Sequence, residues 1–318
     1  MVGAGCPEGV RGTVSATRRL ILAAAQSPRV RRFVCAHGMR LGAARFVAGE
    51  TLDDCVAVLR QLNEQGLHAN TTILGEDVAD ADEARMVAEE YERVLQRLHD
   101  EGLRVNVALK LTHLGLDLGT GVAYENVHRV AERAAELGNF VRIDMEYSAV
   151  VDATLEIYRR LRDAGLDNVG TVLQSYLFRT EADLESLLPL NPNLRFVKGA
   201  YLEPPEVAYP EKSDVDAAYV RLVERSLRGP GYTAIATHDE RLIEHAIAFT
   251  AAERIARDRF EFQMLYGVRP KLQLELAAQG FKVLVATPFG PEWFPYLMRR
   301  LAERPANALF FLRNLVRR

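Results

Sequence analysis

Cysteine is scarce in this sequence. Cys6, Cys35 and Cys55 make an odd number without a Cys-x-x-Cys pair, and a chain of 318 residues does not need disulfide staples to fold. A secreted, disulfide-rich fold is therefore disfavoured, and we expect a reducing, cytoplasmic environment.

Long apolar runs are missing as well. The longest one near the N-terminus, residues 20–25, is too short to span a membrane, and it follows two arginines without a convincing cleavage site. The sequence predicts a soluble protein, and contact with a membrane surface stays open.

An excess of one charge is also absent. The chain has 43 acidic and 40 basic residues, mixed along its length, and a formal net charge of -3. Nucleic-acid-binding proteins usually carry a basic stripe, so this balance argues against such a partner. A small-molecule ligand is the better expectation.

Short β-rich runs, each followed by a longer helical pattern, recur from residue 68 to the end of the chain. Such alternation is typical of parallel βαβ units. The eight runs cover residues 68–74, 105–111, 140–146, 169–175, 194–200, 233–238, 260–265 and 282–288. Between them, segments such as 81–103 and 149–166 carry apolar residues at helical spacing and end near a glycine that suits a C-cap.

Eight such units favour a closed (βα)8 barrel of the TIM type, because closure leaves no exposed sheet edge. A doubly wound open sheet is the alternative, but no Gly-x-Gly-x-x-Gly follows any run, so a dinucleotide-binding fold has little support. We expect residues 68–318 to form the barrel and residues 1–67 to form a helical segment packed on it. In that segment residues 13–25, 30–48 and 51–66 are predicted helices, and the glycine-rich residues 1–11 are predicted to be loose.

Polar side chains stand near the predicted carboxyl ends of these strands. Barrel enzymes place their chemistry at that end, and unpaired charges pointing into a barrel would be costly. We therefore expect a functional site formed by Glu76, Lys110, Asp144, Gln174, Arg195, Lys198, Tyr201, His238, Glu261 and Gln263.

Seven motifs in this region resemble, in order, the signature of the proline dehydrogenase family. They are Ala108-Leu-Lys-Leu-Thr112, Ile143-Asp-Met-Glu146, Val172-Leu-Gln-Ser-Tyr-Leu177, Arg195-Phe-Val-Lys-Gly-Ala-Tyr201, Ala236-Thr-His-Asp239, Phe260-Glu-Phe-Gln263 and Tyr296-Leu-Met-Arg-Arg300. The resemblance extends from about residue 45 to the C-terminus. Seven motifs in order on successive strands are far more specific than any single short pattern.

The resemblance implies that Arg299 and Arg300 hold the carboxylate of the substrate, beside Tyr296. Two guanidinium groups suit this task, because they form charge-assisted hydrogen bonds in a fork-like geometry. The resemblance further implies that Glu76 pairs with Arg299 and helps to close the site.

Other roles are implied around a flavin cofactor, FAD. Lys110, Asp144 and Tyr201 match catalytic positions that line the substrate pocket and the hydrogen-bonded floor beneath the flavin. The matching cofactor positions are Gln174, Arg195, Lys198, Thr237, His238 and Glu261. A cation near the flavin stabilises its electron-rich reduced ring, so Arg195 suits a catalytic role as well.

The implied reaction is transfer of a hydride from C5 of proline to N5 of the flavin, which gives Δ1-pyrroline-5-carboxylate. The substrate amine must be neutral, and Lys110 is placed to help discharge it. The family passes the electrons to a quinone, so peripheral membrane contact is a further expectation.

Two other functions compete with this interpretation. A metal-dependent barrel hydrolase would need ligands such as His113, Asp117, His128, His238 and Asp239, but their spacing fits no compact metal motif, and we expect no metal. A barrel that only binds a ligand or a partner is the second alternative. The complete Tyr-x-x-Arg-Arg, lysine and aspartate set argues against it.

Two positions depart from the family pattern. Thr72 stands where the family usually has aspartate, and Ala286 stands where it has a tyrosine that packs against the substrate ring. Losing that tyrosine opens space beside the ring carbons, unless Phe289 or Phe294 fills it. The alternative substrate is therefore trans-4-hydroxy-L-proline or another cyclic amino acid. The sequence leaves the oligomeric state open.

Overall fold

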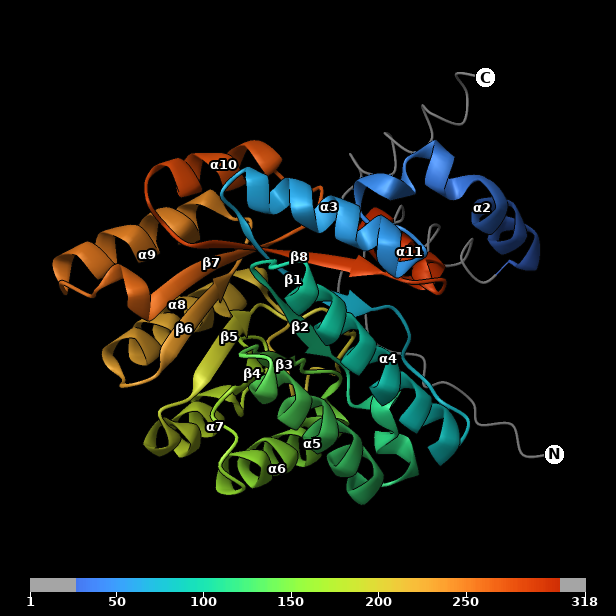
Figure 1. Ribbon diagram of the computed structural model, residues 1–318. Helices are drawn as coiled ribbons and strands as arrows, with labels where there is room; N and C mark the ends of the chain where they lie inside the picture. The colour runs from blue at the N-terminus through green and yellow to red at the C-terminus, as the bar shows by residue number, and fades with distance from the viewer. Residues whose placement is uncertain (1–26, 304–318) are drawn as a thin grey trace.

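Eight parallel strands form a closed barrel in the computed structural model, which describes residues 27–303 (Figure 1). Each strand pairs with the next along the chain, and β8 pairs with β1. The strands are β1 (His68–Ile73), β2 (Val105–Leu109), β3 (Val141–Ile143), β4 (Val169–Gln174), β5 (Asn193–Val197), β6 (Tyr232–Ala236), β7 (Phe260–Leu265) and β8 (Val283–Phe289). Each overlaps the run expected from the sequence, although several end earlier than expected, β3 and β5 most of all. The predicted (βα)8 barrel is confirmed, and the open-sheet alternative is wrong.

One α-helix follows each strand on the outside of the barrel (Figure 1). These helices are α4 (Ala81–Asp100), α5 (Thr120–Glu136), α6 (Val151–Asp163), α7 (Thr180–Leu187), α8 (Lys212–Arg228), α9 (Glu240–Ala252), α10 (Pro270–Ala278) and α11 (Trp293–Glu303). Within residues 27–303, no helix is both long and apolar enough to cross a membrane.

Between residue 27 and the first strand, the structure has two α-helices, α2 (Pro28–Leu41) and α3 (Leu52–Glu64), with a short 3-10 helix (Ala43–Arg45) between them. The single helix expected over residues 30–48 is wrong, because Gly42 has a φ of 124°, which ends α2. Thr51 and Asp54 form a capping box that starts α3 close to its expected position. The segments predicted over residues 1–11 and 13–25 lie outside the described residues.

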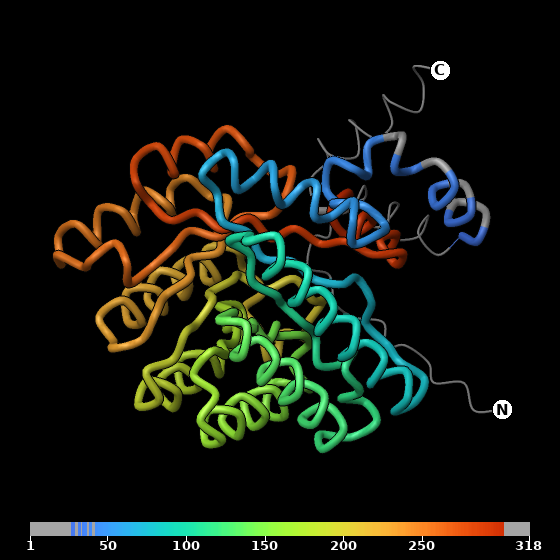
Figure 2. Tube along the Cα trace, in the orientation of Figure 1, coloured from blue at the N-terminus to red at the C-terminus, as the bar shows by residue number. Residues whose placement is uncertain are grey.

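Figure 2 shows α2 and α11 side by side, although they are far apart in the sequence. A hydrophobic cluster that includes Phe46, Trp293 and Leu297 joins this part of the molecule. Glycine is needed at position 38, because a Cβ there would lie 2.6 Å from Cη2 of Trp293. Trp293 also donates a hydrogen bond from Nε1 to Oε1 of Glu50, at 2.6 Å. These contacts fix the start of α11. This helix carries Arg299 and Arg300, the two residues expected to bind the substrate carboxylate, which we call the carboxylate clamp.

Inward-facing and outward-facing side chains alternate along each strand. The outward ones, such as Val141, Leu194 and Phe262, belong to the main hydrophobic core under the helices. The register of a TIM-type barrel brings inward side chains from alternate strands into shared layers. One buried polar layer, from β1, β3, β5 and β7, consists of Asn70, Arg142, Arg195 and Gln263. The next layer toward the carboxyl ends is made of small side chains, Ala108, Val172, Ala236 and Ala286.

Candidate active site

Glu76 lies in the loop after β1, between two cations. Lys110, directly after β2, forms an ion pair with Oε1 of Glu76, and Nη2 of Arg299 on α11 lies 2.7 Å from the same oxygen. Burial would raise the pKa of the Glu76 carboxyl, but Lys110 and Arg299 outweigh burial and lower the pKa below its ordinary range. The pairing of Glu76 with Arg299 that the motifs implied is present, and it links α11 to the first two strands.

α11 brings three of the predicted substrate-binding residues to this end of the barrel. Arg299 reaches Glu76, and Cζ of Arg300 lies 5.3 Å from the ring centroid of Tyr296. The side chain of Arg299 is 38% exposed, so it can meet a ligand from solvent while it stays anchored to Glu76. Lys110 and Arg299 are two cations that share the single carboxylate of Glu76, which suits the binding of a further anionic group.

Asp144 and Arg195 form a second ion pair, across the barrel interior. Nη1 of Arg195 on β5 lies 2.8 Å from Oδ1 of Asp144, which directly follows β3. Arg195 is 8% exposed, and its Nε atom is buried without a hydrogen-bond partner among the described residues. Oε1 of Gln174, at the end of β4, is likewise buried and unpaired within residues 27–303. The carboxyl end of the barrel therefore presents both a donor and an acceptor that the protein itself does not satisfy.

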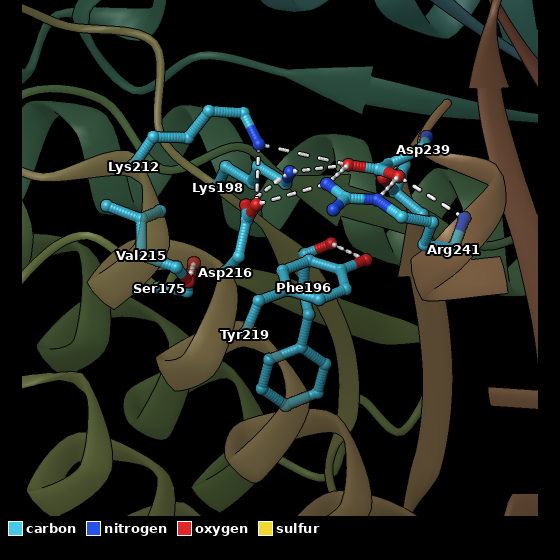
Figure 3. Close-up of polar contacts among 10 residues, drawn as sticks. Ser175, Phe196, Lys198, Lys212, Val215, Asp216, Tyr219, Asp239 and Arg241 are labelled. Carbon is cyan, nitrogen blue, oxygen red and sulfur yellow. Dashed lines mark hydrogen bonds and ion pairs between the residues drawn. The ribbon is translucent and has the colours of Figure 1, made fainter. Parts of the chain in front are cut away.

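Lys198 lies in a cluster of charges above β5 and β6, shown in Figure 3. Its Nζ is 2.5 Å from Oδ1 of Asp216 and 3.4 Å from Oδ2 of Asp239. Lys212 and Arg241 contact the same two carboxylates, so three cations share two anions. The pKa of Asp216 and that of Asp239 are lowered, because the surrounding cations outweigh the effect of burial. The surplus positive charge makes this cluster a candidate site for phosphate groups.

The helix that supplies Asp216 is held against the sheet by buried hydrogen bonds. Ser175 Oγ donates to the Val215 carbonyl at 3.1 Å, and the Tyr219 hydroxyl donates to the Phe196 carbonyl at 3.3 Å (Figure 3). α8 thus has a fixed position relative to β4 and β5, which places Asp216 beside Lys198.

Thr237 and His238 follow β6 and order the neighbouring loop. The Thr237 hydroxyl accepts a hydrogen bond from the Asp239 amide at 3.1 Å. Nε2 of His238 accepts from the Leu265 amide at 2.9 Å, so the proton of a neutral imidazole is on Nδ1. This contact ties β6 to β7 next to the Lys198 cluster.

Tyr201 lies in the loop between β5 and α8. It is partly buried, near Glu76. Burial first, and then the charges of Glu146, Glu76 and Asp144, raise the pKa of its hydroxyl, so Tyr201 stays protonated at neutral pH. Its ring centroid lies 6.3 Å from that of Tyr147, which belongs to the loop after β3.

The sequence analysis missed Glu203, which holds the loop that carries Tyr201. Its carboxylate accepts from the backbone amide of Ser148 at 2.7 Å and from the Ser148 hydroxyl at 2.5 Å. Ser148 starts a 3-10 helix (Ser148–Val150) that leads into α6 and has no side-chain cap of its own. A carboxylate at a helix N-terminus is favourable, so Glu203 acts as a cap from a distant loop. A lone glutamate after Tyr201 gives no sequence signal for this role.

Ala286 faces the barrel interior from β8. Its strand neighbours Val285 and Thr287 are fully buried on the outer side, whereas Ala286 keeps partial exposure. Phe289 and Phe294, the residues considered as substitutes for a larger side chain at this position, are both buried in hydrophobic clusters, 4% and 5% exposed. The layer that Ala286 shares with Ala108, Val172 and Ala236 is made of small side chains, although its register partner on β7 is Leu265.

Glu261 is not at the carboxyl end of its strand, and that expectation is wrong. It is the second residue of β7, and its carboxylate accepts from the Tyr232 hydroxyl at 3.0 Å and pairs with Lys282 Nζ at 2.9 Å. Tyr232 and Lys282 stand at the beginnings of β6 and β8. The strand was predicted correctly, but its length puts Glu261 at the opposite end of the barrel from Lys110. Glu261 instead accepts from Nε2 of Gln263, at 2.5 Å.

The histidines and aspartates considered as metal ligands do not meet. Nδ1 of His128 faces Glu132 at 3.2 Å, and Asp117 accepts from the Tyr147 hydroxyl at 3.3 Å. The ring of His113 packs closely against Gly75. Among residues 27–303, no group of three or more His, Cys, Asp or Glu side chains is arranged to hold a metal ion. The geometry therefore gives the hydrolase alternative no support.

Comparison with known proteins agrees with this geometry. A family model described as proline dehydrogenase matches residues 55–313. Proline dehydrogenase 1 of Bacillus subtilis (strain 168) is 41% identical over 301 residues, which cover 95% of this chain and 99% of the relative. Proline dehydrogenase of Deinococcus radiodurans is 41% identical over 304 residues, with 94% and 98% covered.

A solved structure shares the fold. Proline utilization A from Bdellovibrio bacteriovorus superposes with a TM-score of 0.77 and 24% identity over 91% of this chain. The chain spans 35% of the length of that protein, so the likeness concerns the barrel alone.

Proposed function

Because the chain belongs to the proline dehydrogenase family, we propose that it binds FAD and oxidises L-proline to Δ1-pyrroline-5-carboxylate. The observation that carries this proposal is the ion-pair chain Lys110–Glu76–Arg299 at the carboxyl end of the barrel, opposite Asp144–Arg195. It gathers residues from β1, β2, β3, β5 and α11 at one place, as a barrel active site requires.

The substrate carboxylate is bound by Arg299 and Arg300. Glu76 holds Arg299 from one side, which leaves the other guanidinium nitrogens for the substrate. Tyr296 stacks near Arg300 and restricts its orientation. A pair of pre-positioned arginines fixes the substrate carboxylate and therefore the direction of the ring.

The chain must also handle a proton. When the C5–H bond breaks with its electron pair, a C5=N bond forms, and the amine must already have lost its extra proton. Lys110 is the residue placed to help remove that proton, and Glu76, kept ionised by its lowered pKa, is the counter-ion that holds Lys110 in position. Tyr201 stays protonated, so its hydroxyl is available to donate a hydrogen bond to a ligand, and Asp144 holds Arg195 in place.

The residues at this end fit FAD. The unpaired donor Arg195 Nε and the unpaired acceptor Gln174 Oε1 match the polar atoms of an isoalloxazine ring, and the cationic cluster around Lys198 matches the diphosphate. Thr237 and His238 border the same cluster. The chemistry that FAD supplies when bound is acceptance, at N5, of the hydride that leaves C5 of the substrate.

We propose a quinone as the acceptor that reoxidises the flavin, because the motifs match a family that uses one. Such an acceptor is lipid-soluble, so transient contact with a membrane surface belongs to this proposal. A second substrate is trans-4-hydroxy-L-proline, which the small side chain of Ala286 favours by widening the interior beside the ring.

The test is to purify the protein, add FAD and record its visible spectrum. We expect a noncovalent flavoprotein with a band at roughly 450 nm that reduces a quinone analogue or a dye with L-proline, but not with NAD alone. A colourless protein that does not take up FAD would overturn the proposal. A yellow protein that proline does not reduce would favour a barrel that binds without catalysis.

A further inference from the structure

Two buried amide side chains flank Ala286 inside the barrel. Asn70 on β1 is the register partner of Ala286 on β8. On the other side, β7 pairs Leu265 with Ala286, and Gln263 is the preceding inward-facing residue of that strand. Asn70 is 2% exposed and Gln263 is 4% exposed. Adjacent strands lie about 4.8 Å apart, so Asn70 stands directly beside the space that Ala286 leaves open, and Gln263 stands one inward-facing residue further toward the amino ends of the strands.

Each amide has one buried atom without a partner. Nδ2 of Asn70 and Oε1 of Gln263 form no hydrogen bond to any residue in the described part of the chain. The orientation of the Gln263 amide is set by Glu261, because Nε2 of Gln263 donates to that carboxylate at 2.5 Å and must be the nitrogen. An unpaired buried amide is costly, so the two atoms point to a group that the protein alone does not supply.

The layer between these amides and the substrate region is made of small side chains. Ala108, Ala236 and Ala286 face inward just above Asn70 and Gln263. Thr72, the next inward residue on β1, adds a hydroxyl and pairs in register with Pro288. Large side chains here would cut the amides off from a ligand, whereas alanines leave them within its reach.

We propose that Asn70, Gln263 and Ala286 form a subsite for a hydroxyl group on the substrate ring. A hydroxyl both accepts and donates, so it satisfies the Asn70 donor and the Gln263 acceptor together. A bare methylene group satisfies neither. A carboxylate would lie against the Gln263 oxygen with Glu261 behind it, and an ammonium group would face the Asn70 donor. This inference rests on the proposed function and names its substrate class, ring-hydroxylated derivatives of proline.

The test compares kcat/KM for L-proline with kcat/KM for the two 4-hydroxy epimers of L-proline. We expect the wild type to oxidise one epimer with an efficiency within about tenfold of that for proline. In Asn70→Leu and in Gln263→Met, the ratio of hydroxyproline efficiency to proline efficiency should fall about tenfold. Asn126→Leu is the matched control. Asn126 is a buried asparagine on α5 that donates to the Leu114 carbonyl, outside the barrel interior, so its loss should leave the ratio unchanged.

A binding measurement separates recognition from chemistry. Flavin that has been fully reduced cannot take a hydride, so the dissociation constant of each amino acid for the reduced enzyme reports binding alone. The preferred epimer should bind about tenfold more weakly to Asn70→Leu than to the wild type. Should Asn70→Leu fail to fold, Gln263→Met carries the same test.

The outcomes distinguish the subsite from the proposed function. Unchanged ratios and unchanged dissociation constants in both variants would overturn the subsite and mean that the two amides bind water only. A wild type that oxidises proline but neither epimer would overturn it as well. If the wild type oxidises none of the three amino acids, the proposed function itself fails.

Discussion

The two ends of the barrel both bury charged side chains, but they do so in opposite ways. At the amino end, Arg142 donates to the carbonyls of Thr171 and Asn193 at 3.0 and 2.7 Å and to the Asn193 side chain at 2.5 Å. Glu261 on the same end is held by Tyr232, Lys282 and Gln263. Burial first, and then the charge of Arg195, lower the pKa of Arg142 to about 9, which still leaves it largely charged at neutral pH.

At the carboxyl end, charged and polar groups keep unsatisfied atoms. Arg195 starts from the same inward layer as Arg142, but its guanidinium group points the other way, to Asp144 after β3. Its Nε has no partner in the described structure, and neither has Oε1 of Gln174. Protein folding normally avoids such atoms, and they concentrate where a ligand completes the hydrogen bonding. The amino end is thus organised for stability and the carboxyl end for binding, as expected of a barrel enzyme.

The largest effect, on the free energy of unfolding, is expected from removing the buried carboxylate at the amino end. Glu261→Leu leaves Lys282, Tyr232 and Gln263 without their shared carboxylate, and loss of one partner from a buried pair costs roughly 3 to 5 kcal/mol of unfolding free energy. Urea unfolding would measure the loss. The control Glu64→Leu, at an exposed position at the end of α3, should change the free energy by less than ~0.5 kcal/mol. Equal effects in the two variants would contradict the role of Glu261.

The next largest effect is expected from changes to the carboxylate clamp, Arg299 and Arg300. Replacing Arg299 or Arg300 with methionine removes charge-assisted bonds worth roughly 1.5 to 3 kcal/mol each, so substrate binding should weaken by at least about tenfold while FAD stays bound. Steady-state kinetics and flavin content would check this, with Arg93→Met, on the exposed face of α4, as control. Wild-type substrate affinity in both clamp variants would show that α11 does not bind the substrate. Lys110→Met should act mainly on the reduction step.

Ala286→Tyr would place an aromatic ring above Asn70 and Gln263. The ratio of the efficiencies on proline and trans-4-hydroxyproline should then shift toward proline, by ~1 to 3 kcal/mol at most, because filling a pocket discriminates only modestly. Turnover measured on both substrates would decide. An unchanged ratio would mean that residue 286 does not face the substrate ring.

The smallest expected effect is a shift in pH dependence. The pKa of Glu76 is held below its ordinary value of 4.5, so its ion pairs are complete above that pH and are lost as the pH falls through the lower folded value. Lys110→Met removes the stronger of the two lowering charges, so the loss should begin at a higher pH. Thermal unfolding between roughly pH 3 and 6 would follow this, with the exposed Lys271→Met as control. Superimposable profiles would contradict the assignment.

The strands and most of the site could be predicted from the sequence, because both rest on local patterns. Alternating β-rich and helical runs fix the order of a barrel, and polar residues that follow a strand, such as Lys110 and Asp144, must lie at its carboxyl end. Glu261 failed this reasoning, because a position relative to the strand ends depends on where the strand starts. The strand over residues 260–265 was predicted with the right bounds, but Glu261 is its second residue and was assigned to the wrong end.

Contacts between distant loops could not be predicted. Glu203 caps a helix that begins 55 residues earlier, and nothing near either residue indicates the other. The neighbours of Ala286 were hidden for a similar reason, because Asn70 is 216 residues away in the sequence and meets it only through closure of β8 onto β1. Helix α2 was misjudged for a local reason, since Gly42 ends it within an otherwise helical pattern.

The most direct test of the difference between the two ends compares Arg142 and Arg195, two buried arginines of one layer whose guanidinium groups point to opposite ends. Arg142→Met and Arg195→Met remove the same charge from the same depth, and FAD affinity can be measured by fluorescence after the flavin has been removed. Arg195→Met should weaken FAD binding by at least about tenfold, because it loses charge-assisted hydrogen bonds, whereas Arg142→Met should lower the stability and leave the dissociation constant within about twofold. Equal weakening of FAD binding in the two variants, or a larger effect of Arg142→Met, would contradict the account.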